Sequence, residues 1–239
     1  MEIRRDWPIS FDEGAFVAAQ GGSFARLLQQ PAKLDTFREA LAAVQQAIEP
    51  AACWASFPIQ KILHEKLVLA NGVRIGGGPV VAVVGGAEEL IVAVCTVGPA
   101  ADRLVKEAQQ ARQLFKAMLL SDLASWAVDT IRQGLCLWLE EQAHAQGLRV
   151  SAPLSPGESV WSVADQAVIF SLLDTRQIGV SLSPSMVMTP IKSLSLIIGV
   201  GSQPMGVEGA SNCDFCTIKE RCNYRAQRGN VQLAPPGLP

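Results

Sequence analysis

The sequence has few of the residues and patterns that mark the common hydrolases. It contains only two histidines and one tyrosine in 239 residues. His64 lies in a charged stretch and His144 between two alanines, so the two histidines do not form a pair at metal-binding spacing. The G-x-S-x-G motif of serine hydrolases is also missing. These absences argue against hydrolysis through a serine nucleophile or a catalytic zinc.

Long apolar runs and basic stripes are missing too. The apolar runs at 80–84 and 90–94 have the length of strands, whereas a membrane-spanning helix needs about 20 residues. No apolar segment follows the two arginines near the start, so we expect no secretion signal. Lysine and arginine are spread along a chain of net charge −2, without the basic face of a nucleic-acid binder. We therefore expect a cytoplasmic protein that binds neither membrane nor nucleic acid.

The six cysteines are unevenly distributed. Cys53, Cys95 and Cys136 are isolated in apolar surroundings, whereas the other three crowd into residues 213–222. In a cytosolic chain such clustering is more typical of metal binding than of disulfides. The pattern therefore predicts a metal site in a reducing compartment.

The clustered cysteines have the spacing of metal ligands. Cys213 and Cys216 form a C-x-x-C pair, and Cys222 follows after five intervening residues. Three thiolates suit an iron–sulfur cluster, which we favour, or Zn²⁺. A redox dithiol or a set of free thiols would be compatible with the same spacing. The fourth ligand stays open among a small molecule, a partner protein and the three isolated cysteines.

Hydrophobic periodicity predicts long helices together with short strands. Apolar residues three and four apart predict helices, at 24–30, 34–48, 59–69, 100–146 and 163–174. Short apolar runs predict strands, as an antiparallel pair at 79–84 and 90–96 and again at 178–182 and 194–200. This mixture predicts an α+β fold in which an antiparallel sheet packs against long helices.

From residue 154 onward the chain carries several short motifs. They are Ser155-Pro156-Gly157, Trp161, Asp165-Gln166, the segments 169–174, 178–182 and 197–201, and Met188-Thr189-Pro190-Ile191-Lys192-Ser193. Together they resemble the activation domain of vitamin-B12-dependent methionine synthase, in particular the short stand-alone proteins of that superfamily. Thr96-Val97-Gly98 and the cysteine-bearing segment 213–225 resemble those proteins as well.

The resemblance implies a domain that binds S-adenosylmethionine and presents it to a corrinoid protein whose cobalt has been oxidised to Co(II). One electron reduces the cobalt to Co(I), and methylation by S-adenosylmethionine then consumes the Co(I) state. The implied partners are a corrinoid-binding protein or methyltransferase, with a reductase or ferredoxin as electron source. An iron–sulfur cluster on the cysteines fits the role of electron relay.

The resemblance also implies the cofactor-binding residues, although it identifies no catalytic residue. They are Ser155, Pro156, Gly157, Glu158, Met188 and Lys192. The family's loop reads Arg-x-x-Pro-Gly-Tyr, but Pro153 stands at the arginine position and Glu158 at the tyrosine position. The arginine would have paired with the ligand's carboxylate. Arg149 is a candidate to replace it, and Glu158 is a candidate contact for the ligand's amine or sulfonium.

We therefore expect four regions in the chain. They are a helical N-terminal segment at 1–50, an activation-domain-like α+β domain at 51–210, a cysteine metal-binding motif at 211–225 and a disordered tail at 226–239. Three functions compete. The first is a reductive activator, accessory to a corrinoid-dependent methyltransferase, that uses S-adenosylmethionine and an electron. The second is an iron–sulfur donor or docking adaptor for a corrinoid protein, without S-adenosylmethionine. The third is a module whose C-terminus is stapled by Zn²⁺.

Overall fold

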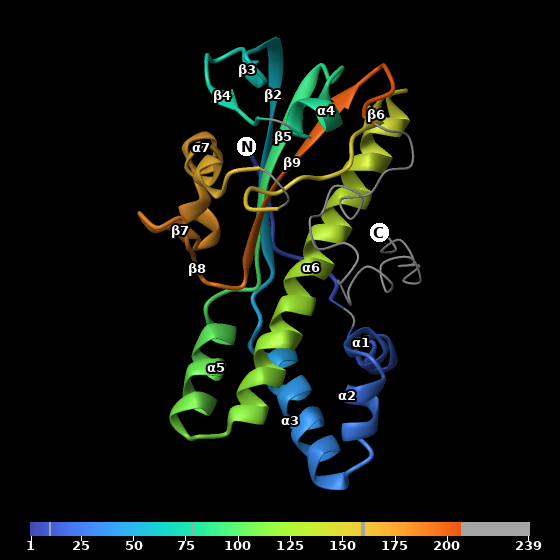
Figure 1. Cartoon of the computed structure of the whole chain (residues 1–239), viewed down its shortest axis with the longest axis vertical. Coiled ribbons are helices and arrows are strands. Elements are labelled where there is room, and N and C mark those ends of the chain that lie inside the picture. Colours follow the sequence, from blue (N-terminus) through green and yellow to red (C-terminus); the bar gives the residue numbers. More distant parts are fainter. Residues whose placement is uncertain (10, 78, 159–160, 207–239) are drawn as a thin grey trace.

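Residues 1–9, 11–77, 79–158 and 161–206 are described by the computed structural model (Figure 1). The expected cysteine motif and the expected tail lie outside these residues. The metal ligands Cys213, Cys216 and Cys222 therefore stay a prediction.

An antiparallel sheet organises the chain. Its central strand is β5 (Glu89–Thr96), which pairs with β2 (Ala51–Leu63) on one side and with β9 (Ser193–Gly201) on the other. Four shorter strands extend these three: β1 (Glu2–Arg4), β3 (Lys66–Leu69), β4 (Arg74–Ile75) and β6 (Arg149–Val150). The order is β4-β3-β2-β5-β9-β6, and β1 also pairs with β2. The predicted α+β fold with an antiparallel sheet and long helices is confirmed.

Both faces of the central strand are buried. Successive side chains of a strand point to opposite faces, so Val92 and Val94 lie in one core and Ala93 and Cys95 in the other. Every residue of β5 after Glu89 is buried. The strand is therefore a continuous apolar run in the sequence, because neither of its faces meets water.

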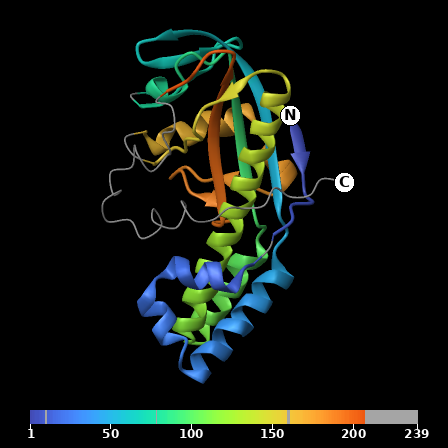
Figure 2. The ribbon, with the colours of Figure 1, turned by 90° about the vertical axis from the view of Figure 1, so that its right-hand side faces the viewer.

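Helices cover these two faces (Figures 1 and 2). On the face of Ala93 lies α6 (Leu114–Ala145), which has 32 residues and buries Ile131 and Leu135 there. The other face is covered by α4 (Pro79–Val84), α7 (Gln166–Leu172) and the short 3-10 helix η2 (Thr175–Ile178). No described helix, α6 included, combines the length and the apolar character that crossing a bilayer requires.

A helical end extends beyond the sheet. The N-terminal half of α6 packs there with four other helices: α1 (Glu13–Gln20), α2 (Gly22–Leu27), α3 (Pro31–Ala47) and α5 (Ala100–Gln110). Phe37 of α3 is fully buried, stacks on Phe16 with 5.7 Å between ring centroids, and meets the edge of Phe24 at 6.1 Å. The helices predicted at 24–30 and 34–48 thus correspond to α2 and α3. The segment 1–50 also contains a strand, β1, in addition to its helices.

The predicted helix at 59–69 is wrong, because these residues form the end of β2 and all of β3. Leu63 pairs with Lys66, and the two residues between them, His64 and Glu65, have φ of 49° and 59°. Positive φ at both central residues is the geometry of a type I′ hairpin turn, whose twist matches that of the strands. The turn lacks the usual Asn-Gly or Asp-Gly signal, and the apolar residues around it happen to fall at helical spacing.

The predicted strand at 79–84 is also wrong, because this segment is the helix α4. Val80, Val83 and Val84 are buried at three- and four-residue spacing against the sheet. The strand predicted beside it at 90–96 is present as β5. Since β2 and β9 occupy both edges of β5, no edge is left for a further strand.

The remaining predicted helices and strands agree approximately with the observed ones. The stretch at 100–146 is two helices, α5 and α6, joined by a short turn. The strand at 194–200 is β9. The strand predicted at 178–182 is shorter than expected, because only β7 (Ser181–Leu182) pairs there, with β8 (Met188–Thr189).

We expect Phe37→Ala to lower the free energy of unfolding by about 3–5 kcal/mol, because it removes a fully buried ring and leaves a cavity among the helices. Urea unfolding followed by circular dichroism measures this. The matched control is Arg38→Ala, whose ion pair with Glu13 at 3.7 Å is exposed, so the loss stays below about 1 kcal/mol. Equal losses in the two variants would contradict this account of the packing.

Candidate functional site

A tight turn beside β9 carries the four residues predicted for the cofactor loop. Before the turn, Leu154 pairs with Ile197 of β9 through backbone hydrogen bonds of 3.0 and 2.8 Å. The Glu158 N–H then donates to the Ser155 carbonyl at 3.1 Å. Gly157 has φ of +89°, which glycine adopts without steric cost. The turn predicted from the sequence is therefore present, and the residue before it is fixed to the sheet.

Asp165 ties this turn to the β3–β4 hairpin. It ends the 3-10 helix η1 (Val163–Asp165), and its side chain is 13% exposed. The Oδ2 atom accepts hydrogen bonds from the Trp161 Nε1–H at 2.8 Å and from the Gly76 N–H at 2.9 Å. The Oδ1 atom lies 3.7 Å from the Lys66 ammonium. One carboxylate thus joins three separate segments of the chain.

A buried amide follows Asp165. Gln166 begins α7, within the helix predicted at 163–174, and is 7% exposed. Its Oε1 atom has no hydrogen-bond partner among the described residues. Leaving a buried acceptor unpaired costs about 1–3 kcal/mol. The position therefore favours a molecule that donates a hydrogen bond to it.

Glu158 acts electrostatically on a buried arginine of α6. Arg132 is 8% exposed, and its Nη2 and Nε atoms donate to Asp129 Oδ1 at 2.7 and 2.8 Å. Burial lowers the pKa of the Arg132 guanidinium, but nearby anionic groups, Asp129 foremost and Glu158 among them, outweigh burial and raise that pKa overall. The contact with Asp129 and the charge of Glu158 thus both favour the protonated form of this guanidinium.

The sequence motifs do not include Arg132, although a signal for it is present. It stands four residues after Val128 and three before Leu135, on the buried stripe of α6. A charged residue on such a stripe needs a partner or a function. Periodicity alone does not distinguish between these two reasons.

Lys192 connects the start of β9 to α6. Its Nζ atom donates to Ser121 Oγ at 2.8 Å and to Ser125 Oγ at 2.9 Å. Burial lowers the pKa of this ammonium, and the carboxylates of Asp122 and Asp102 oppose the shift only in part. In the structure the amine thus makes an internal contact, and its role as a ligand contact stays a prediction.

The residues predicted for the site are spread along β9. Arg149 pairs with the last residue of this strand, Leu154 pairs with the middle one, and Lys192 precedes the first. Strand residues rise about 3.3 Å each, so Arg149 and Lys192 lie roughly 13 Å or more along the strand from the turn. Met188 is half-buried in β8. Arg149 is therefore poorly placed to replace the missing arginine, whereas Arg132 is electrostatically coupled to the turn.

The three isolated cysteines are buried or half-buried thiols. Cys53 and Cys95 are fully buried on neighbouring strands, in opposite cores, and Cys136 is half-buried on α6. Burial raises the pKa of Cys53 and of Cys136 to about 11, and it raises that of Cys95 as well. Metal binding requires the thiolate, so their surroundings disfavour ligation. Within the described ranges, no cluster of three or more His, Cys, Asp or Glu residues is suited to a metal ion.

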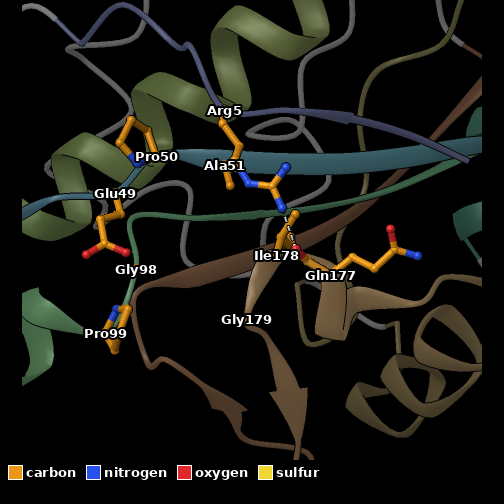
Figure 3. Close-up of a pocket in the computed structure, with 9 residues that line it drawn as sticks. All are labelled: Arg5, Glu49, Pro50, Ala51, Gly98, Pro99, Gln177, Ile178 and Gly179. Carbon is orange, nitrogen blue, oxygen red and sulfur yellow. Dashed lines mark hydrogen bonds between the residues drawn. The ribbon is translucent and has the colours of Figure 1, made fainter.

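A pocket of about 510 Å³ lies away from the turn (Figure 3). It is lined by Arg5, by residues 49–51, by Gly98 and Pro99, and by residues 177–179. None of the six residues predicted to bind the cofactor lines it. It is therefore a separate feature of the molecule.

Comparisons with known proteins point to one fold. No protein-family model and no curated protein matches the chain. Among solved structures, the chain is similar to the crystal structure of the MetH reactivation domain bound to AdoHcy. The match has 14% sequence identity and a TM-score of 0.54, and it covers 90% of this chain and 80% of that one.

The chain has the fold of this reactivation domain. The fold expected from the resemblance in the sequence is thereby confirmed. In this chain the turn at 155–158 lies beside β9.

We expect Asp165→Ala to lower the free energy of unfolding by about 2 kcal/mol, because it leaves the Gly76 N–H and the Trp161 Nε1–H without their acceptor. Urea unfolding measures the loss. Asp174→Ala is the control, since its partner Arg176 is 86% exposed and the expected change is small. If both variants unfold like the parent chain, Asp165 does not tie the three segments together.

Proposed function

We propose that this protein binds S-adenosylmethionine and serves in the reactivation of a corrinoid-dependent methyltransferase related to methionine synthase. The observation that carries the proposal is the fold shared with a reactivation domain that was solved with AdoHcy bound. AdoHcy is the molecule that S-adenosylmethionine becomes once its methyl group has been transferred. The motifs around the turn at 155–158 support the same conclusion independently.

The charges beside the turn suit this ligand. S-adenosylmethionine carries a sulfonium, an ammonium and a carboxylate, and hence a net charge of about +1. Glu158 and Asp129 contribute two negative charges and Arg132 one positive charge, a net of −1. In the proposal Arg132, whose Nε and Nη2 atoms contact Asp129, holds the carboxylate in place of the family's missing arginine. Glu158 then attracts the cationic end.

The remaining predicted contacts frame the ligand. The backbone of residues 155–157 forms one side, and Met188 in β8 and Lys192 just before β9 are the more distant predicted contacts. The unpaired Oε1 atom of Gln166 is suited to accept a hydrogen bond from the amino group of adenine, because a glutamine amide matches the polar edge of that base.

The reaction requires the protein to position the reactants more than to supply acid–base groups. The partner's Co(II) first gains one electron and becomes Co(I). Its electron pair then attacks the methyl carbon of the sulfonium, so that a Co–C bond forms, the S–C bond breaks and AdoHcy leaves. No proton moves in this step. The protein therefore accelerates it by holding the methyl group in line with the cobalt.

Calorimetric titration of the whole chain with S-adenosylmethionine is expected to show binding in the micromolar range. Glu158→Gln keeps the shape of the side chain but removes its charge, and we expect affinity to fall about tenfold. Arg132→Met is expected to weaken binding at least as much. The matched control is Arg149→Met, which we expect to bind like the parent chain.

Two outcomes of this titration would change the proposal. Binding that is lost in Arg149→Met but kept in Arg132→Met would reassign the ligand's carboxylate. A brown, reducible protein that does not bind S-adenosylmethionine would favour an iron–sulfur electron donor or docking adaptor for a corrinoid protein. Thermal unfolding of each variant shows whether a loss of binding reflects a loss of fold.

The source of the electron is a separate part of the proposal. The spacing of Cys213, Cys216 and Cys222 supports a metal site, whereas burial disfavours the thiolate form of the other three cysteines. An iron–sulfur cluster held there would supply one-electron chemistry, with a reductase or ferredoxin behind it. A zinc ion would instead staple the C-terminus. The fourth ligand would come from a small molecule or the partner protein.

Metal analysis of anaerobically purified protein tests this part. We expect iron and acid-labile sulfide in the parent chain, their loss in Cys216→Ser, and their retention when Cys53, Cys95 and Cys136 are each replaced by alanine. A colourless protein that contains one zinc ion would favour a structural zinc site at the C-terminus. Loss of metal in any of the three alanine variants would identify the fourth ligand and contradict our assignment.

A further inference from the structure

The pocket shown in Figure 3 is lined by two residues of opposite charge that come from different segments. Arg5 follows β1, and Glu49 lies between α3 and β2. The Arg5 Nη2 atom donates to the Gln177 carbonyl at 2.6 Å, which holds the guanidinium against the 177–179 side of the pocket. The position of the positive charge is therefore fixed by a backbone contact.

The negative charge is positioned from the other side. Gly98 has φ of +81°, and a Cβ atom built there would lie 2.9 Å from the Cβ atom of Glu49. Glu49 thus packs directly over Gly98, and its own N–H donates to the Val97 carbonyl at 2.8 Å. The glycine leaves room for the Glu49 side chain at this wall of the pocket.

Arg5 and Glu49 line one pocket without pairing. Among the residues that the structure describes, neither Arg5 nor Glu49 takes part in an ion pair. The surfaces between them are largely apolar, from Pro50, Pro99 and Ile178. Two unpaired opposite charges at an apolar pocket favour a molecule that carries the complementary charges at its two ends.

We propose that this pocket is a second ligand site and that it binds a small zwitterion. The ligand's carboxylate lies on Arg5, its ammonium lies on Glu49, and an aliphatic linker crosses the apolar wall. The volume of about 510 Å³ is within the usual range of small-molecule sites, roughly 300–1,000 Å³. The site shares no residue with the turn, Asp129 or Arg132, so it does not depend on the proposed function.

A series of ω-amino acids tests the proposal and measures the separation of the two charges. The whole chain is titrated by calorimetry with glycine, β-alanine, 4-aminobutyrate and 6-aminohexanoate. We expect one length to bind best, and to bind about tenfold more tightly than the aliphatic acid or the amine of the same length. If no member of the series binds at millimolar concentration, or if the zwitterion binds no better than the acid and the amine, the proposal is overturned.

Two variants assign the ends of the ligand. Arg5→Met is expected to reduce the affinity of the best zwitterion to that of the amine, and Glu49→Gln to that of the acid. Both side chains are exposed, so the fold is expected to persist, and thermal unfolding checks this. Unchanged zwitterion binding in both variants would place the ligand elsewhere and overturn the proposal. Titration of Arg5→Met with S-adenosylmethionine separates the two sites, since we expect that binding to be unaffected.

Discussion

The rest of the structure depends on one requirement, that both faces of β5 are kept from water. Every residue of this strand after Glu89 is buried, so the sheet needs a layer on each side. The long helix α6 supplies one layer, and α4, α7 and η2 supply the other. The chain passes from the first layer to the second around the outer side of β9, and the turn at 155–158 lies on that path. The candidate site is therefore located where the two layers meet.

Much of this fold could be predicted from local patterns. The run at 90–96 is uniformly apolar because it is buried on both faces, and the period of α6 follows from its contact with the sheet. The failures occurred where local patterns are ambiguous. The hairpin at His64 and Glu65 lacks a strong turn residue, and the valine-rich segment at 79–84 suits either a strand or a helix. The hairpin is decided by the pairing of the adjacent strands β2 and β3, and the helix at 79–84 by β2 and β9, which occupy both edges of β5.

The candidate site also has one part that could be predicted from the sequence and another that could not. The turn at Ser155-Pro156-Gly157 was predictable, because proline and glycine restrict or permit particular backbone angles within a few residues. The coupling of Glu158 to Arg132 was not, since it depends on how α6 lies relative to β9. The pocket with Arg5 and Glu49 draws on four segments of the chain, and no pattern within any one of them indicates it. A site whose residues come from distant segments can be recognised only in the three-dimensional structure.

The first strand has a consequence for how the protein behaves when it is shortened. β1 pairs with residues 52–54 of β2, and β3 pairs with residues 59–63 of the same strand, so the two together cover most of that edge. A chain that began after Arg5 would keep its core but would present the open N–H and C=O groups of β2 near Trp54. Open edges pair with the edges of other molecules. Such a chain would therefore fail by self-association, as dimers or larger aggregates, before it failed by unfolding.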